Sequence, residues 1–174
     1  MLPWTASWAD GPPVRAAISG PLQAAIRIVA PNSKVLQPNE INMRECESVP
    51  KSPGLARADF NGDGLEDAAA ILKTHVAGDV RSFEGRKYRK AELLFVIFIN
   101  DGKGGYLTRT QDKYNNQIPA MMFVDVIPPR KIRSIEEGKD VDLKNPAVML
   151  TFCGQSAAAY VVTGSTVRGI PLSD

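Results

Sequence analysis

The sequence predicts an α+β protein that is mainly β, with a mostly antiparallel sheet, one short N-terminal helix and one strand–loop–strand unit. Runs of β-branched and aromatic residues, each of strand length, recur along the chain after residue 54. Glycine and proline supply 14 and 13 residues, which favours frequent turns over a helical bundle. Helical spacing of apolar residues occurs only near the front of the chain.

Length and composition indicate one soluble domain. A chain of 174 residues is long enough to bury a core, and 44% hydrophobic with 23% charged residues is ordinary for a globular protein. The net charge of +2 is too small to indicate a nucleic-acid or membrane-surface partner. The longest apolar run, 93–99, has the length of a strand and not of a transmembrane helix.

The N-terminal part predicts a flexible lead-in over residues 1–20, followed by a single domain over 21–174. Pro21 suits the first turn of a helix, and apolar residues recur at helical spacing over 21–30. The start of the chain lacks the basic and apolar parts of a signal peptide, although residues 6–9, which are small apart from Trp8, resemble the remnant of a cleavage region. Export therefore stays open from the N-terminus alone.

The predicted strands follow in order after the helix. We expect short extended pieces over 32–54 and then strands at 55–60, 68–74, 91–99, 106–111, 121–127, 147–153, 157–162 and 166–170. The turn at 100–106 is a strong hairpin signal. The basic stretch 78–90 predicts a solvated hairpin or loop, and the charged stretch 130–142 predicts a break between strands.

One acidic loop has the pattern of a calcium site. Its predicted ligands are the side chains of Asp59, Asn61, Asp63 and Asp67 and the backbone carbonyl of Leu65. A Ca²⁺ ion takes six to eight oxygen ligands from a chain that can curl around it, and two glycines lie within this loop. The alternative is a turn rich in Asp and Asn that binds no metal. Because the three carboxylates of this ligand set lie within nine residues and repel one another, we favour the metal.

Residues 58–69, A-D-F-N-G-D-G-L-E-D-A-A, resemble the calcium loop of FG-GAP/VCBS-type repeats, which build integrin-like propellers. The segment N-D-G-K-G-G-Y at 100–106 resembles the hairpin that follows in that family. An EF-hand fits less well, because its twelfth position would be Ala70 and not Glu. The loop occurs once, and one unit cannot close a propeller. The resemblance therefore implies a stand-alone calcium-binding domain of the kind found in small exported bacterial proteins.

The remaining reactive residues do not form a recognisable active-site motif in the sequence. Gly154-Gln155-Ser156 matches a nucleophile elbow only in part, and His75, the single histidine, precedes that serine. A histidine-rich zinc site is excluded by number. Cys46 and Cys153 would form a disulfide in an exported protein or remain free thiols in a cytoplasmic one.

The sequence thus predicts a non-catalytic domain with a structural Ca²⁺ loop that binds a protein or a cell-surface glycan. The resemblance implies a periplasmic or extracellular location, with the cytoplasm as the alternative. The competing hypothesis is a hydrolase whose active site is not recognisable in the sequence. No nucleic-acid partner and no transmembrane segment are expected.

Overall fold

The computed structural model describes residues 18, 20–46, 48–136 and 138–172. Most of the predicted lead-in over 1–20 lies outside these residues. The described elements are α1 (Gly20–Val29), β1 (Lys34–Val35), a 3-10 helix η1 (Pro38–Glu40), β2 (Leu55–Ala58), β3 (Asp67–Phe83), β4 (Arg86–Asn100), β5 (Tyr106–Ile118), β6 (Met122–Ile127), β7 (Lys131–Arg133), β8 (Asp140–Asp142), β9 (Ala147–Phe152), β10 (Ser156–Thr163) and β11 (Thr166–Leu172). None of the helices described is long and apolar enough to cross a membrane.

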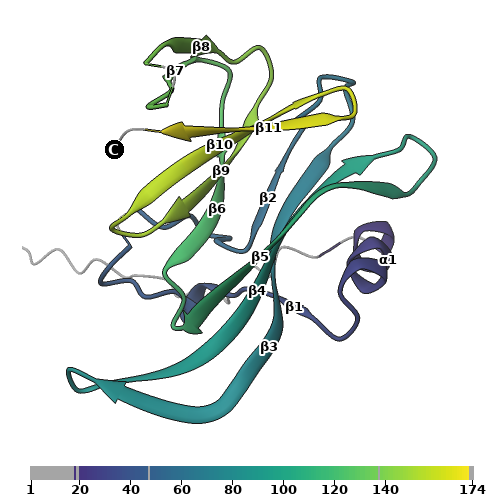
Figure 1. The fold of residues 1–174 in the computed structure, drawn as a ribbon. Coiled ribbons are helices and arrows are strands. Elements are labelled where there is room, and N and C mark those ends of the chain that lie inside the picture. The colour runs from purple at the N-terminus through teal and green to yellow at the C-terminus, as the bar shows by residue number, and fades with distance from the viewer. Residues whose placement is uncertain (1–17, 19, 47, 137, 173–174) are drawn as a thin grey trace, which may run out of the picture.

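Two antiparallel sheets make up most of the fold (Figure 1). In the first sheet the order is β1-β3-β4-β5, and β2 pairs with β3 on the same side as β1. In the second sheet the order is β11-β10-β9-β6, and β7 pairs with β8 as a separate small hairpin. The predicted fold class, mainly antiparallel β with one short helix, is confirmed.

The core has three parts, each enclosed by different elements. The largest part lies between the two sheets and contains Phe95 and Ile97 of β4 together with Val124 and Leu150 from the second sheet. A second part joins the opposite face of β3 and β4 to α1, and a third lies near the β7–β8 hairpin. Side chains alternate across a strand, so β4 contributes to cores on both of its faces. This explains why its sequence is apolar almost without interruption.

Helix α1 covers the outer face of the first sheet (Figure 1). Its buried residues, Leu22, Ala25 and Ile26, lie at helical spacing, while Ile28 is exposed. Asn32 follows with a φ of 65°, a conformation in which asparagine is commoner than most residues and which turns the chain away from the helix. The helix predicted over 21–30 is therefore present, displaced by one residue.

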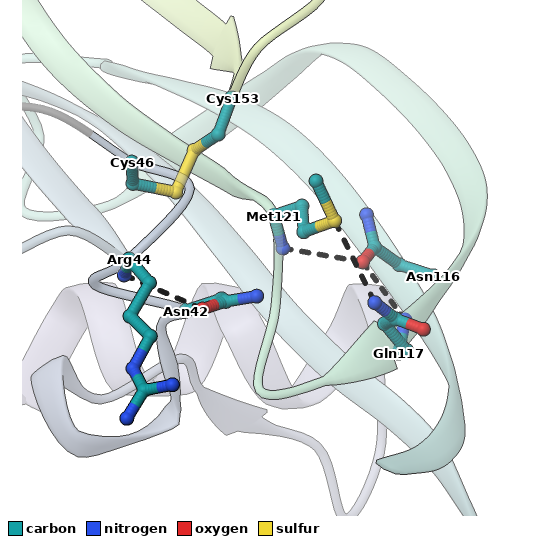
Figure 2. Close-up of a disulfide and its surroundings, with 7 residues drawn as sticks. All are labelled: Asn42, Arg44, Cys46, Asn116, Gln117, Met121 and Cys153. Carbon is teal, nitrogen blue, oxygen red and sulfur yellow. Dashed lines mark hydrogen bonds between the residues drawn. A yellow bond between two sulfur atoms is a disulfide. The ribbon is translucent and has the colours of Figure 1, made fainter. Parts of the chain in front are cut away.

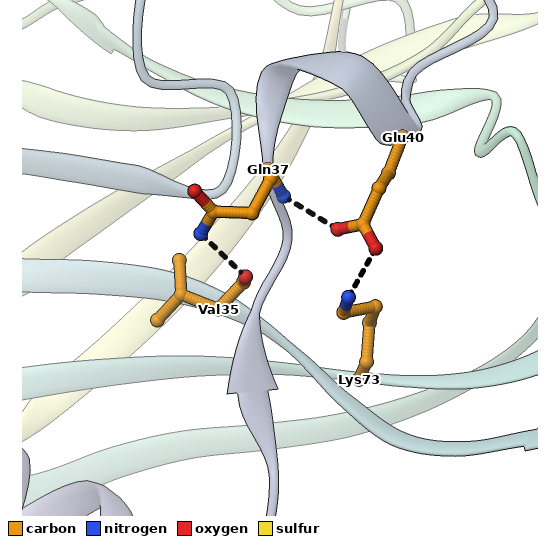
Figure 3. A network of polar contacts seen from close by, with 4 residues as sticks. All are labelled: Val35, Gln37, Glu40 and Lys73. Carbon is orange, nitrogen blue, oxygen red and sulfur yellow. Dashed lines mark hydrogen bonds and ion pairs between the residues drawn. The ribbon is translucent and has the colours of Figure 1, made fainter. Parts of the chain in front are cut away.

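The segment after β1 is fixed to β3 by a small polar network (Figure 3). Glu40 forms an ion pair with Lys73 of β3, and its other carboxylate oxygen accepts a hydrogen bond from the backbone amide of Gln37 at 2.8 Å. The side chain of Gln37 donates to the carbonyl of Val35 at 2.8 Å. Since Lys73 and Glu40 are both mostly shielded from solvent, the pair fastens η1 onto the sheet.

Three stretches differ from their predicted extent, and one of them is β5, predicted over 106–111, which continues to Ile118. The strand predicted over 68–74 continues to Phe83, and β4 begins at Arg86, so the basic stretch 78–90 forms the outer half of a long hairpin. That hairpin projects past the rest of the first sheet at the bottom of the view in Figure 1. The charged stretch 130–142, predicted as a break, contains β7 and β8. These differences arise because exposed strands of polar residues lack an apolar pattern.

Candidate metal centre

The predicted calcium loop connects β2 to β3 and is closed by hydrogen bonds to its own backbone. The carboxylate of Asp59 accepts from the backbone amides of Gly62, Asp63 and Gly64 at 2.7, 3.1 and 2.8 Å. Gly62 and Gly64 have φ values of 80° and 85°, which residues with a Cβ rarely adopt. The glycines thus let three successive amides curl around one carboxylate.

Asn61 and Asp63 complete the exposed part of the loop. The side-chain amide of Asn61 donates to the carboxylate of Asp63 at 2.8 Å, and its oxygen accepts from the Asp63 backbone at 3.0 Å. The second carboxylate oxygen of Asp63 accepts from the backbone amide of Leu65 at 2.9 Å. The structure therefore brings Asp59, Asn61 and Asp63 together on one short turn.

Asp67 lies beneath this turn and is fully buried. One carboxylate oxygen accepts from the backbone amides of Phe60 and Asn61 at 2.9 and 3.3 Å, and the other accepts from the backbone amide of Asn100 at 2.9 Å. Burial raises the pKa of the Asp67 carboxyl; the three amide donors partly offset that rise, and the nearby charge of Asp63 adds to it. Asp67 therefore acts as a bridge between the acidic loop and the end of β4.

The second turn of the predicted unit lies against the first. Asp101, after β4, accepts hydrogen bonds from the backbone amides of Gly105 and Lys103 at 2.8 and 2.7 Å, which lower the pKa of its carboxyl. A Cβ on Gly102 would lie 3.4 Å from Cδ1 of Leu65, so the two turns are in contact. The hairpin 100–106 and the loop 59–67, separated in sequence, thus form one unit.

The oxygen atoms of the loop are the type of ligand that a hard cation such as Ca²⁺ prefers, but their hydrogen bonds leave few lone pairs free to bind it. A carboxylate oxygen has two lone pairs, so Asp63, which accepts one hydrogen bond on each oxygen, keeps two positions for a cation, and Asp59, which accepts three hydrogen bonds, keeps one. In Asp67 one oxygen already accepts two hydrogen bonds, which leaves it at most one free lone pair, on the other oxygen. Asp67 can thus provide a single contact at most. Among the described residues, no group of three or more His, Cys, Asp and Glu side chains is placed to hold a metal ion.

The other candidate residues are dispersed. Cys46 and Cys153 form a disulfide with their Cα atoms 4.8 Å apart, and it joins the segment after η1 to the end of β9 (Figure 2). Neither sulfur is therefore a thiol in this structure. His75 is exposed in β3, and Ser156 is exposed at the start of β10. Within the described part of the chain, no hydrogen bond joins the side chains of these two residues.

Comparison with known protein families, curated proteins and solved structures yields no match to this chain. The resemblance to FG-GAP/VCBS-type repeats therefore stays a prediction that rests on the loop and the hairpin. Asn100 and Asp101 are the residues of this unit that the predicted ligand set did not include. The signal for the inward position of Asp67 was the two-residue period of β3, which places it on the same face as the buried Ala69 and Ile71.

Replacing Gly62 with alanine is expected to destabilise the loop by about 1–2 kcal/mol, because of its positive φ. The new Cβ would also lie 2.5 Å from the side-chain nitrogen of Asn145, which must then move. Gly64→Ala is the matched control, since its φ is similar and no atom lies within 4 Å of the new Cβ. Urea unfolding should show the larger loss for Gly62→Ala, and the Asn145→Ala background should remove the excess. If Gly62→Ala destabilises the protein equally with Asn145 and with Asn145→Ala, the side chain of Asn145 moves aside without an energetic cost.

Proposed function

We propose that the chain is an exported, non-catalytic domain in which Ca²⁺ bound by the loop 59–67 holds the β2–β3 and β4–β5 hairpins together. Asp59 and Asp63 are the charged ligands of this proposal, Asn61 and the carbonyl of Leu65 are the neutral ones, and Asp67 supplies at most one contact. The ion neutralises the carboxylates that crowd this turn. Its binding energy adds to the free energy of unfolding, because the unfolded chain holds no such site.

The observation that carries the proposal is the convergence of oxygen-bearing side chains on one glycine-hinged turn. Asp59, Asn61 and Asp63 all take part in the same hydrogen-bonded loop, which is preorganised by Asp67 below it. A preformed loop loses less conformational entropy when it binds an ion. Export is supported by the Cys46–Cys153 disulfide, because disulfides persist mainly in oxidising compartments.

Calcium is expected to raise the melting temperature of the wild-type protein relative to EDTA. At a hundredfold excess of free Ca²⁺ over Kd the gain is about 2.7 kcal/mol. For a domain of this size that corresponds to a shift of about 5–10 °C. Asp63→Ala should abolish the shift, and so should Asp63→Asn, which keeps an acceptor for the Leu65 amide while removing the charge. Differential scanning calorimetry measures both effects.

Asp101→Asn is the matched control for this experiment. Asp101 is also a carboxylate that accepts backbone amides within a turn, but it belongs to the neighbouring hairpin and not to the proposed ligand set. Its variant should keep the full calcium shift. An identical melting temperature in Ca²⁺ and EDTA for the wild type would refute the calcium site, and Mg²⁺ giving the same shift would refute its preference for calcium.

A further inference from the structure

An open groove of about 660 Å³ lies beside the projecting half of the β3–β4 hairpin. One wall comes from that hairpin, over residues 81–90. The other comes from the end of β5 and from the turn between β9 and β10. The groove lies at the opposite end of β3 from the acidic loop, and none of the proposed calcium ligands lines it.

The charge of the groove is positive. Arg81, Arg89 and Lys90 line it, and no Asp or Glu is among the described residues that do. Within the described part of the chain none of the three forms an ion pair, whereas Arg86 on the same hairpin is paired with Glu45 at 3.1 Å. Since the whole chain carries a net charge of only +2, this is a local concentration of unneutralised cations. Such a lining is complementary to an anionic ligand.

Aromatic rings provide flat apolar surface in the same groove. Phe83, near the tip of the hairpin, is 68% exposed, and Tyr88 lies on the paired strand. On the opposite wall Tyr114 and Phe152 pack edge to face, with ring centroids 5.2 Å apart. A phenylalanine exposed to this extent gains little from folding, which makes it a candidate contact for a ligand.

Side-chain amides supply the remaining polar lining. Asn116 is fixed in place because its oxygen accepts from the backbone amides of Gln117 and Met121 at 2.8 and 3.4 Å, and its amide nitrogen remains as a donor (Figure 2). Gln117 donates to the sulfur of Met121 at 3.5 Å and keeps its oxygen as an acceptor. Asn115 and Gln155 are exposed at the same groove. Amides both donate and accept, as do the hydroxyl groups of a sugar.

We propose that this groove binds an acidic oligosaccharide, with the carboxylates of the ligand on Arg81 and Lys90, which lie on the same face of the hairpin. The hydroxyl groups of the oligosaccharide then form hydrogen bonds with the side-chain amides, and its sugar rings pack against the aromatic side chains. An acidic peptide would also satisfy the cations, and its backbone N–H and C=O groups can pair with the side-chain amides, so the flat aromatic surface is what favours a ligand built of rings. The proposal selects a glycan from the two partner classes that the sequence predicts, and it rests on residues other than the proposed calcium ligands.

Isothermal titration calorimetry with an oligomer of glucuronic acid tests the proposal. The oligomer of glucose with the same linkage and length is the matched ligand, because it lacks only the carboxylates. We expect binding of the glucuronic acid oligomer that weakens as salt is added, and at least tenfold weaker binding of the glucose oligomer. An absence of binding, or equal binding of both oligomers, would overturn the proposal. So would tighter binding of polyglutamate or of a single-stranded oligonucleotide.

Variants place the ligand in the groove. Arg81→Ala and Lys90→Ala should each weaken binding of the glucuronic acid oligomer about fivefold, and Phe83→Ala should weaken binding of both oligomers by a similar factor. Lys131→Ala, an exposed cation on β7 outside the groove, should leave the affinity unchanged. Equal effects of Lys131→Ala and Lys90→Ala would show non-specific attraction instead of a site.

The calcium site and the oligosaccharide groove can be tested independently of each other. Asp63→Asn should lose the calcium-dependent shift in melting temperature and still bind the glucuronic acid oligomer when measured well below its melting temperature. Lys90→Ala should show the reverse. Loss of oligosaccharide binding in a folded Asp63→Asn protein would show that the groove depends on the loop, contrary to the proposal.

Discussion

Replacing Asp67 with alanine is expected to lower the free energy of unfolding by about 3–5 kcal/mol. The buried carboxylate accepts hydrogen bonds from the backbone amides of Phe60, Asn61 and Asn100. Each buried donor left without a partner costs about 1–3 kcal/mol, and the amides of Asn61 and Asn100 are only partly buried. Urea unfolding in EDTA measures this loss without any contribution from a metal.

Asp63→Ala serves as the comparison, because the same loop there loses a carboxylate that is exposed. Its loss in EDTA should stay near 1 kcal/mol, since solvent replaces the amide partners. A loss of that size for Asp67→Ala would contradict its assignment as the bridge between the hairpins.

The pH dependence of Asp67 provides a second readout with a definite sign. Burial raises the pKa of the carboxyl above its ordinary value of 3.8, so the folded protein binds this proton more tightly than the unfolded chain. Ionisation therefore opposes folding. In EDTA the free energy of unfolding of the wild type, relative to Asp67→Asn, should fall as the pH rises from below 3.8 through the raised pKa. A difference that grows over the same range would mean that the amide donors outweigh burial.

Much of the fold follows from the sequence, because burial imposes a pattern on it. The central strand β4, helix α1 and the turn at 100–106 all have apolar periods or turn residues that identify them. The outer half of the β3–β4 hairpin has neither, since its side chains are mostly exposed and its stability comes from pairing between Val80 and Arg89 and their neighbours. Three-residue strands such as β7 and β8 are too short to show a period at all.

The same distinction applies to the two candidate sites, because the acidic loop can be recognised in the sequence and the groove cannot. The proposed oxygen ligands of the loop lie within nine residues, so their alternation is visible in the sequence. The contact of Asp67 with Asn100 spans 33 residues and depends on the register of β3 against β4. The groove is even harder to predict from the sequence, because its basic residues come from one hairpin while Tyr114 and Phe152 belong to β5 and β9. Its basic stretch therefore resembles an ordinary solvated hairpin when considered alone.

Removal of the Cys46–Cys153 disulfide is also expected to lower the free energy of unfolding by a large amount. Cys46 and Cys153 close a loop with a sequence separation of 107, for which the chain-entropy account gives about 4–5 kcal/mol of stabilisation. The double variant Cys46→Ala/Cys153→Ala should lose this amount in urea unfolding. Alanine avoids placing hydroxyl groups at two buried positions. The folded state should persist, because hydrogen bonds from Asn42 to Ala120 and from Cys153 to Met121, made by backbone atoms, remain.

Reductant supplies the internal control for the disulfide. Wild-type protein unfolded in the presence of dithiothreitol should match the double variant in its oxidised buffer, and the double variant itself should not respond to reductant. Because Phe152 and Gln155 flank Cys153 and line the groove, the reduced protein should also bind the glucuronic acid oligomer more weakly. A wild-type unfolding curve that reductant leaves unchanged would mean that the crosslink constrains the unfolded chain far less than its length implies. It would also remove the disulfide as support for export.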